Sequence, residues 1–357
     1  MFDMNNIFLY PNISDPAYHM KIRNLIPQID NEMPNKVGKK FNLMNHQKDV
    51  AKVFNLFSNS KSLLLLSEMG SGKTITSLNL IENMKTILSD HNTRALILVP
   101  NQLIENVFYS EIMGLVEDKY EKRVTGNKYV DKDLRQKLNS TTQNTIERKR
   151  LEKISLKKIK DVYEIVTHKK WEQYVLSLSD EEISIQFSNR IIVVDEIHKA
   201  KNPTSNLYLA LQKVLLGAKN VWFIGMNAER HIIDDPTELC QYINLMHMNN
   251  TKNPKSVLTE EVIDGFFSLN NDIKKESQKE IANAIRGLIV FVDGHDPKWF
   301  PTRVDIGYTQ KEINKMYPSN YQNPINIAKP ITLKNVPRYV GKRDIFLRPV
   351  ELKSKCC

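Results

Sequence analysis

The chain has 357 residues, of which 41% are hydrophobic, so it is long enough to bury the cores of two or three ordinary domains. No stretch approaches the roughly 18 consecutive apolar residues of a membrane span, and the amino terminus does not resemble a secretory signal. We therefore expect an intracellular protein with no membrane partner. Three cysteines exclude both a disulfide framework and a four-cysteine zinc site. The net charge is +10, and it is unevenly distributed.

The hydrophobic pattern predicts a helix over residues 46–57, followed by a series of short apolar strands. A buried strand at residues 63–66 leads into a loop that contains glycine and then into a helix that starts near Lys73. Further apolar strands are predicted at residues 94–100, 163–168, 190–196 and 221–225. Short apolar strands that alternate with helices predict an α/β domain, with a mainly parallel sheet covered on both faces.

This pattern divides the chain into four segments. An amino-terminal segment covers residues 1–40, and the α/β domain covers residues 41–250. Residues 251–306 are predicted to form a helical linker that runs into a strand at residues 288–292. Six of the fifteen prolines lie in the last 57 residues, so we expect residues 307–357 to form an extended tail.

The positive charge is concentrated at residues 119–160, between the second and third predicted strands. This segment contains fourteen Lys or Arg and five Asp or Glu. Such a basic insertion favours a polyanionic partner. A pair of charged helices that is only solvated is an almost equally good interpretation.

The loop SEMGSGKT at residues 67–74 has the form of a phosphate-binding loop. Gly70 and Gly72 let the backbone approach a triphosphate, so that successive N–H groups and the start of the following helix surround it. Lys73 is expected to reach the β and γ phosphates, and the Thr74 hydroxyl to bind Mg²⁺. The residues predicted to hold the triphosphate are Gly70, Ser71, Gly72, Lys73 and Thr74.

A second motif, IIVVDEIH at residues 191–198, consists of four apolar residues followed by Asp195, Glu196 and His198. Both motifs come directly after a buried strand, where ligand sites of α/β domains form. Asp195 is expected to hold the metal, and Glu196 to polarise the water that attacks the γ phosphate. The alternative is that these acids only cap a helix after the strand.

Together, SEMGSGKT and DEIHKAKN resemble motifs I and II of superfamily 2 helicases and translocases, most closely the Swi/Snf-like branch. The string NLMNHQ resembles the adenine-recognition segment of that branch, which implies that Gln47 reads the adenine edge. Residues 96–111 resemble motif Ia and residues 165–171 resemble motif Ib, two loops that grip the nucleic-acid backbone in the family. The nucleic-acid contacts implied by this resemblance are Pro100, Asn101, Thr167 and His168.

The strings LYPNISDPAYHMKI and IRGLIVFVDGHDPKWFP resemble a narrower group, the DEAD/Swi/Snf-like helicases of large nucleocytoplasmic DNA viruses. That group includes the small subunit of the poxvirus early transcription factor. The resemblance implies a RecA-like P-loop NTPase domain at residues 41–250, with ATP and Mg²⁺ as cofactors. It also implies a nucleic-acid partner, with DNA favoured over RNA, and viral transcription machinery as a further partner.

The sequence departs from the family pattern at motif III, which usually ends in Thr-Ala-Thr-Pro or Thr-Gly-Thr-Pro. The matching residues here are Asn227, Ala228, Glu229 and Arg230. In the family this segment links the nucleotide state to movement of the nucleic acid, partly through motif II, so His198 and Asn227 are the expected coupling residues. The acid and the base at the end of the segment either impair this coupling or pair with each other.

Motors of this family contain two RecA-like lobes, and each lobe needs about 150 residues. Only 56 residues follow Pro301, so we expect a first lobe that hydrolyses ATP efficiently with a second lobe and its arginine in another chain. The alternative is a catalytically impaired, ATP-binding regulator or assembly factor in viral transcription. A small P-loop kinase would fit the length of the chain, but it would not fit the DEIH motif.

Overall fold

The computed structural model describes Met20 and residues 41–292, with gaps at residues 57, 68–70, 117, 144, 229–235, 256–257, 259–264 and 266–283. The described residues all belong to one unit, Met1–Val292. The predictions for Gly70, Glu229, Arg230, the tail at residues 307–357 and almost all of residues 1–40 lie outside the described residues.

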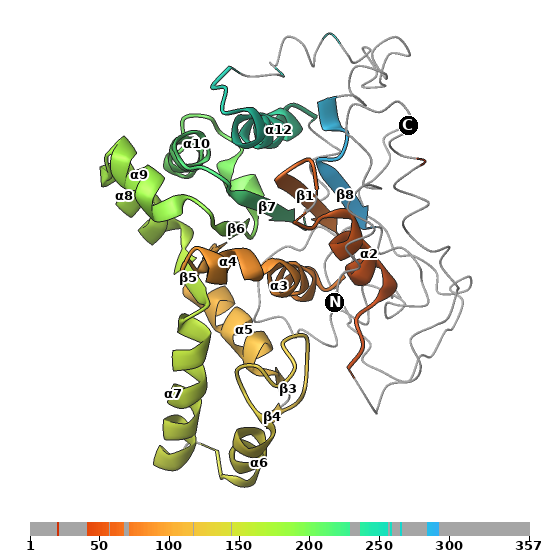
Figure 1. Ribbon diagram of the computed structural model, residues 1–357, viewed down its shortest axis with the longest axis vertical. Helices are drawn as coiled ribbons and strands as arrows, with labels where there is room; N and C mark the ends of the chain where they lie inside the picture. Colours follow the sequence, from red (N-terminus) through yellow and green to blue (C-terminus); the bar gives the residue numbers. More distant parts are fainter. Residues whose placement is uncertain are drawn as a thin grey trace, which may run out of the picture. The chain divides into compact units, whose positions relative to one another are not determined.

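The described residues form a six-stranded sheet in the order β5-β2-β6-β7-β1-β8 (Figure 1). The bounds of these strands are β1 Ser62–Ser67, β2 Ala95–Val99, β5 Tyr163–Thr167, β6 Ile191–Val194, β7 Trp222–Asn227 and β8 Ile289–Val292. Every pairing in this sheet is parallel, so all six strands end at the same edge. The predicted α/β fold with a parallel sheet and the predicted positions of its strands are thus confirmed.

The last strand of the sheet comes from beyond the expected domain boundary at residue 250. β8 pairs with β1, and Leu64 lies opposite Ile289 in the register. The sheet therefore extends along the chain to Val292, and β1 is an inner strand with a partner on each side.

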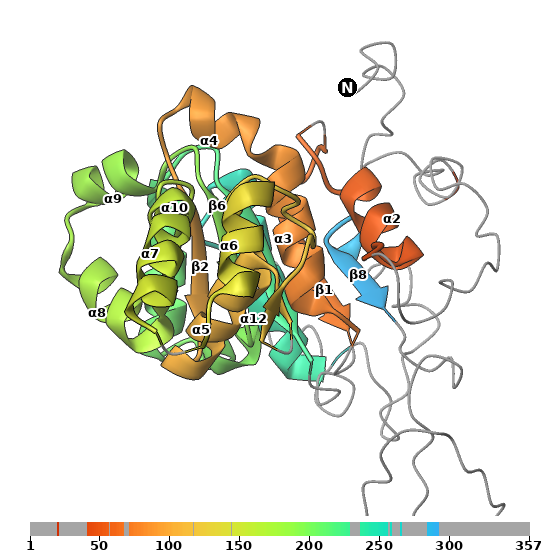
Figure 2. The same cartoon turned by 90° about the horizontal axis from the view of Figure 1, so that it is seen from below.

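Helices cover both faces of the sheet, as the two views in Figures 1 and 2 show. The helices on one face are α2 (Asn45–Val53), α3 (Lys73–Met84), α4 (Thr86–Asp90), α5 (Gln102–Met113) and α7 (Ile146–Lys160). The helices on the other face are α8 (His168–Ser177), α9 (Asp180–Phe187), α10 (Asn206–Gly217) and α12 (Pro236–Thr251). Helix α2 ends earlier than the predicted residue 57, because the backbone of Phe54 is extended.

The strand β2 illustrates why the strands are apolar runs rather than alternating sequences. Ala95, Ile97 and Val99 belong to the core under α3 and α5. Leu96 and Leu98 belong to the core under α8 and α10, and all five residues are fully buried. A strand with helices on both faces must be apolar at every position. Among the residues that the structure describes, no helix combines the length and the apolar character that a membrane crossing requires.

The basic insertion folds as a small unit beside α5. A short antiparallel hairpin of β3 (Leu115–Val116) and β4 (Lys119–Tyr120) leads into it, and α6 (Lys132–Ser140) and α7 follow. Side chains cap both helices, since Asp131 Oδ1 accepts from Leu134 N at 2.9 Å and Thr145 Oγ1 accepts from Arg148 N at 3.2 Å. The insertion thus contains two charged helices, and a polyanionic partner for them stays a prediction.

Candidate functional site

The parallel strands bring the two predicted motifs to one edge of the sheet (Figure 1). β1 leads into the glycine loop, β6 leads into the acidic pair, and β7 lies between these two strands. Because neighbouring strands lie about 4.8 Å apart, the two motifs begin roughly 10 Å from each other. Side chains of both motifs are thus able to meet across the end of β7.

The glycine loop enters α3 through a position that requires glycine. Gly72 has a left-handed backbone, with φ of +80°, and it directly precedes the first helical residue, Lys73. A Cβ atom at Gly72 would lie 2.5 Å from Nε2 of Gln47. The left-handed backbone disfavours any residue with a Cβ atom here, and such an atom would also displace the Gln47 amide. The free N–H groups at the start of α3 consequently open onto the loop, where an anion is favoured.

Helix α2 is fastened to this loop by Gln47 and His46. The side-chain amide of Gln47 donates to the carbonyl oxygen of Gly72 at 3.4 Å, and its oxygen accepts from the N–H of Met44 at 3.0 Å. His46 Nε2 lies 3.1 Å from the carbonyl oxygen of Ser71. Gln47 is only 1% exposed, so its amide supports the loop in this structure. Adenine recognition by Gln47 stays a prediction.

Asp195 and Glu196 have different surroundings although they are adjacent. The N–H of Asp195 donates to the carbonyl oxygen of Leu98 at 2.9 Å, which fixes the end of β6 against β2. Burial raises the pKa of Asp195 to about 6, the charge of Glu196 adds to this effect, and Lys73 opposes it. Glu196 has a left-handed backbone and leads into a 3₁₀ turn, η2 (Ile197–Ala200).

A row of polar contacts connects α3 to β7 through Glu196. Lys73 Nζ lies 3.6 Å from Glu196 Oε1. His198 Nδ1 lies 3.2 Å from Glu196 Oε2 and 3.1 Å from Asn227 Oδ1, so its N–H faces two acceptors. The hydrogen bond from His198 lowers the pKa of Glu196; burial opposes this effect, and the charge of Lys73 supports it. The structure therefore joins the lysine of the loop, Glu196 of the acidic pair and both expected coupling residues.

The four predicted nucleic-acid residues lie at the ends of β2 and β5. The exposed Asn101 caps α5, because its Oδ1 accepts from the N–H of Ile104 at 3.1 Å. Pro100 and Thr167 are half-buried. His168 is 5% exposed, and its ring lies against the backbone of Leu98 and Asp195. The imidazole thus lies inside the domain rather than on its surface, and it would have to turn outward to touch a nucleic acid directly.

Burial also controls the protonation of this imidazole. It lowers the pKa of His168 to about 4, and the charges of Lys199 and His198 act in the same direction. Backbone groups of Leu98 and Asp195 oppose the shift. His168 is accordingly neutral near pH 7 and packs against the strand end that carries Asp195.

A second polar cluster, centred on Glu82 of α3, was not predicted from the sequence. Glu82 Oε1 accepts from the hydroxyls of Tyr129 at 2.8 Å and Tyr163 at 2.6 Å, and Oε2 pairs with Lys128 and, at 3.3 Å, with Lys85. The carboxylate is 5% exposed. Burial acts to raise its pKa, but the Lys128 and tyrosine contacts outweigh burial and lower it. The helix that starts at the glycine loop is thereby tied to the basic insertion and to β5.

A parallel sheet covered by helices on both faces, with a glycine loop and an acidic pair at one edge, is the architecture of an α/β domain whose ligand site lies at the carboxyl ends of its strands. Residues 46–264 match the SNF2-related domain, and this match covers more than half of the chain. The chain therefore belongs to the SNF2-related family. The expected relation to the Swi/Snf-like branch is confirmed at this level.

Two proteins of Acanthamoeba polyphaga mimivirus, R563 and L377, are similar to the chain, and both are named "Putative ATP-dependent RNA helicase". R563 is 22% identical over 334 residues, which is 89% of this chain and 53% of R563. L377 is 23% identical over 321 residues, which is 80% of this chain and 26% of L377. The chain thus spans about half the length of one relative and about a quarter of the other.

Two solved structures are also similar. The Sulfolobus solfataricus SWI2/SNF2 ATPase core in complex with dsDNA has 14% identity and a TM-score of 0.41, with 71% of this chain and 46% of that chain covered. The Pyrococcus furiosus Hef helicase domain has 16% identity and a TM-score of 0.36, with 74% of this chain and 40% of that chain covered.

Proposed function

We propose that the chain is the first motor lobe of a nucleic-acid-dependent ATPase, which binds ATP with Mg²⁺ at the edge of the sheet between the glycine loop and the acidic pair. The observation that carries this proposal is the 3.6 Å ion pair between Lys73 and Glu196, because it joins two motifs that are more than 120 residues apart. Family membership supports the same reading.

The surroundings of Asp195 fit a divalent cation. Its carboxyl group is buried beside the charge of Glu196, and Lys73 is the cation that opposes the rise in its pKa. Oxygen ligands from one or two side chains plus phosphate oxygens are what Mg²⁺ requires.

Each residue then has a distinct task. The N–H groups of Ser71 to Thr74 and the ammonium of Lys73 bind the phosphates, while Thr74 and Asp195 hold Mg²⁺. The metal supplies charge neutralisation on the phosphates. Glu196, whose lowered pKa keeps it ionised at neutral pH, accepts a hydrogen bond from the attacking water and orients it toward the γ phosphate. Efficient turnover is proposed to need an arginine from a second lobe.

A second candidate function is an ATP-binding regulator or assembly factor in viral transcription. The contact between Asn227 and His198 favours this alternative, because the side-chain amide of Asn227 engages the same imidazole nitrogen that contacts Glu196. In this alternative the chain binds ATP at the same place, but nucleic acid does not stimulate hydrolysis.

Steady-state ATP hydrolysis tests the proposal, measured with and without single- and double-stranded DNA and RNA. Without a second lobe we expect slow turnover, which nucleic acid stimulates and which Lys73→Ala and Glu196→Gln both abolish. Lys219→Ala and Glu181→Gln, which change exposed side chains elsewhere, serve as matched controls and should leave it intact. Tight ATP binding without stimulated turnover would support the regulator instead. Turnover that survives Glu196→Gln would contradict the assigned role of that carboxylate.

A further inference from the structure

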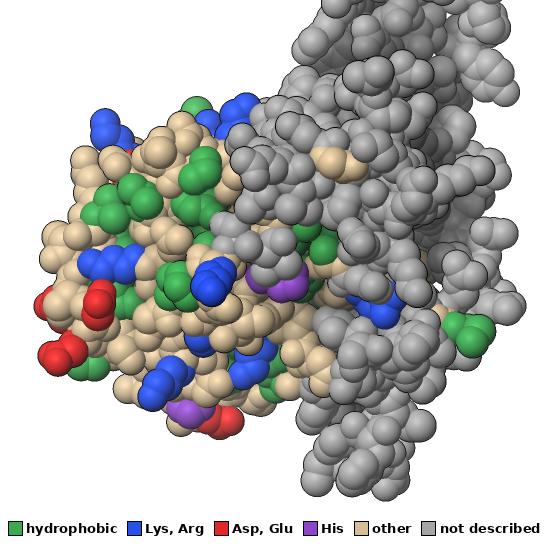
Figure 3. Space-filling view, turned by 90° about the horizontal axis from the view of Figure 1, so that it is seen from above, with side chains coloured by type: hydrophobic (Ala, Val, Ile, Leu, Met, Phe, Trp, Pro, Cys, Tyr) green, Lys and Arg blue, Asp and Glu red, His purple; other side chains and the backbone are tan. Residues whose placement is uncertain are grey.

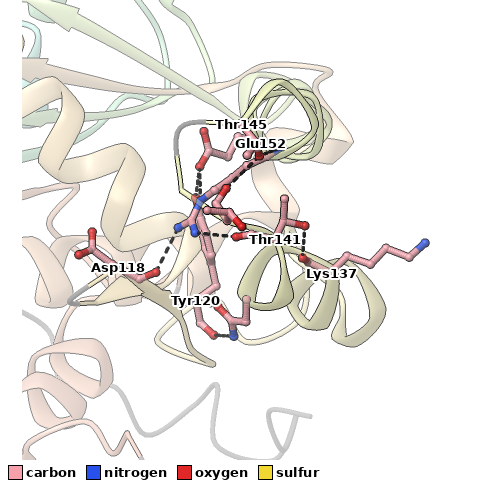
Figure 4. A network of polar contacts seen from close by, with 9 residues as sticks. Asp118, Tyr120, Lys137, Thr141, Thr145 and Glu152 are labelled. Atoms are coloured by element: carbon pink, nitrogen blue, oxygen red, sulfur yellow. Dashed lines mark hydrogen bonds and ion pairs between the residues drawn. The ribbon is translucent and has the colours of Figure 1, made fainter.

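Several basic side chains of the insertion form hydrogen bonds or ion pairs that hold its helices and hairpin together. Arg148 of α7 is 7% exposed and donates to Glu152 Oε1 at 3.3 Å and to the carbonyl oxygens of Thr141 at 3.4 Å and Asp118 at 3.1 Å (Figure 4). The Tyr120 hydroxyl donates to the same Glu152 oxygen at 2.6 Å. This network fixes α7 against α6 and the hairpin, so that its outer face has a defined direction.

Further basic residues of the insertion have partners within the insertion or on the neighbouring helix α5. Arg123 pairs with Glu111 at 2.8 Å, and Lys158 pairs with Asp131 at 3.3 Å. Arg135 donates to the carbonyl oxygen of Val130 at 2.7 Å. The positive charge of these side chains is therefore balanced or engaged within the insertion or by α5, and it does not explain the excess of the block.

The excess includes four lysines outside α7, namely Lys119, Lys122, Lys132 and Lys137, which are exposed and form no ion pair with any described residue. The rest of it is aligned on the outer face of α7. Four exposed lysines lie on this face of α7: Lys149, Lys153, Lys157 and Lys160, called the α7 lysine row below. None of the four forms an ion pair with any residue that the structure describes. At 100° per residue these four positions fall within about 80° of the helix circumference. The opposite side of α7, with Leu151 and Ile159, is buried in the core.

The spacing of the row suits a repeating anion. With a rise of 1.5 Å per residue, successive lysines are separated by roughly 6, 6 and 4.5 Å, and the row is about 16 Å long. Like charges three or four residues apart repel one another on a helix. An extended polyanion that follows the row relieves this repulsion, and phosphates along a duplex supply about one charge per 1.7 Å of its axis.

We propose that the α7 lysine row binds the phosphate backbone of a nucleic acid, as a contact surface additional to the loops at the ends of β2 and β5. This inference rests on the nucleic-acid partner in the proposed function, and it adds where on the chain that partner is held. Backbone contacts of this kind carry no sequence information, so the row contributes affinity and orientation rather than specificity.

Two other classes of partner fit the row less well. A membrane-bound amphipathic helix buries its apolar side in lipid, but the apolar side of α7 is already buried in the domain. The centres of protein–protein interfaces are depleted of lysine, whereas lysine occurs at four positions of this row. By contrast, the face over α10 and α12 in Figure 3 has basic side chains scattered among apolar and uncharged ones.

The test is binding of a fluorescently labelled DNA duplex, followed by fluorescence anisotropy without nucleotide between about 50 and 200 mM salt. The variant Lys153→Gln/Lys157→Gln removes two members of the row. Its matched control, Lys219→Gln/Lys255→Gln, removes the same charge from two exposed lysines elsewhere. We expect the slope of log affinity against log salt to become shallower by about 1.8 in the row variant and to change little in the control. Lys153→Arg/Lys157→Arg should keep the parent slope.

The outcomes separate this inference from the proposed function. If the parent binds the duplex and both glutamine variants keep its slope, the row is only a solvated face and the inference is overturned. It is also overturned if the row variant keeps its DNA affinity but loses binding of a polyglutamate probe, since the row then contacts acidic protein. Failure of the parent to bind any duplex would contradict the nucleic-acid partner in the proposed function, and with it this inference. ATP binding by the row variant, measured with a fluorescent ATP analogue, should equal that of the parent.

Discussion

The ammonium group of Lys73 lies 3.6 Å from the carboxylate of Glu196. The two side chains are 13% and 26% exposed, so the ion pair contributes at most about 1 kcal/mol to stability. If both groups serve the nucleotide instead, Lys73 exchanges Glu196 for phosphate when ATP binds. The pair is therefore expected to hold both groups near their working positions rather than to stabilise the fold.

Replacing Lys73 tests whether this side chain binds the nucleotide or stabilises the fold. Lys73→Ala should lower ATP affinity by roughly 10- to 100-fold, since a charge-assisted hydrogen bond contributes about 1.5–3 kcal/mol. The free energy of unfolding without nucleotide should change by less than about 1 kcal/mol. Urea unfolding and titration with a fluorescent ATP analogue measure the two quantities, and Lys219→Ala is the control. A large loss of stability without nucleotide would show that Lys73 is primarily structural.

Gly72 provides a test of the loop geometry that does not depend on catalysis. Gly72→Ala combines a left-handed backbone, which costs about 1–2 kcal/mol, with a Cβ atom 2.5 Å from Gln47 Nε2. Gly126→Ala is the matched control, because Gly126 has φ of +65° but its Cβ would meet only Lys122 Cε at 3.7 Å. We expect both variants to lose stability in urea unfolding, with the larger loss for Gly72→Ala. Only Gly72→Ala should lose ATP binding, and equal ATP affinity in the two variants would argue against the loop as the phosphate site.

We expect the contribution of Glu82 to the free energy of unfolding to depend on pH. Glu82→Gln should lower the free energy of unfolding at pH 7 by about 2 kcal/mol, because it removes a buried charge from Lys128 and Lys85 while their cations remain. The folded-state pKa of Glu82 lies below its ordinary value, so its contribution is present above about pH 4.5 and is lost as the pH falls through the folded pKa.

Urea unfolding of the parent and of Glu82→Gln at several pH values tests this sign. The difference between the two proteins should shrink as the solution becomes acidic. Glu181→Gln, at an exposed position of α9, should give no difference at any pH. A difference between parent and Glu82→Gln that grows in acid would show that the carboxyl is protonated in the folded chain.

The parts of the fold and of the site that could be predicted are those with a local signal in the sequence. The strands and the glycine loop have local signals, namely runs such as ALILV and IIVV and a glycine string before a helix. His198 and Asn227 were expected as coupling residues only through the family resemblance, and the structure brings them together because β6 and β7 are neighbours in the sheet. Site geometry of this kind follows from parallel strands that end at one edge.

Other features depend on contacts between residues that no pattern links. Glu82 meets Tyr129 and Tyr163, which are 47 and 81 positions away and belong to no motif. The buried imidazole of His168 likewise reflects how α8 packs, which the string around it does not encode. Charge counting found the basic insertion, but only the packing of α7 separates its inner arginine from its outer lysines.

The shared contact of His198 leads to a prediction about non-additive variants. His198 Nδ1 faces both Glu196 Oε2 and Asn227 Oδ1, so Asn227→Ala leaves Glu196 as the remaining acceptor of these two. A stronger hold on Glu196 should make it less available to the attacking water and should slow hydrolysis several-fold. ATP affinity should not change, since neither side chain is assigned to the nucleotide.

A double-mutant cycle of Asn227→Ala and His198→Ala tests whether Asn227 acts through the imidazole. Single-turnover hydrolysis of radiolabelled ATP, with protein in excess and duplex DNA present, is sensitive enough for a slow reaction. If Asn227 acts through His198, Asn227→Ala should have no further effect once His198→Ala is present, because groups that share one contact are not additive. Asn220→Ala, which removes an exposed asparagine near the start of β7, is the control for a general loss of packing. Strictly additive effects of Asn227→Ala and His198→Ala would mean that Asn227 influences the reaction by a route that does not include the imidazole.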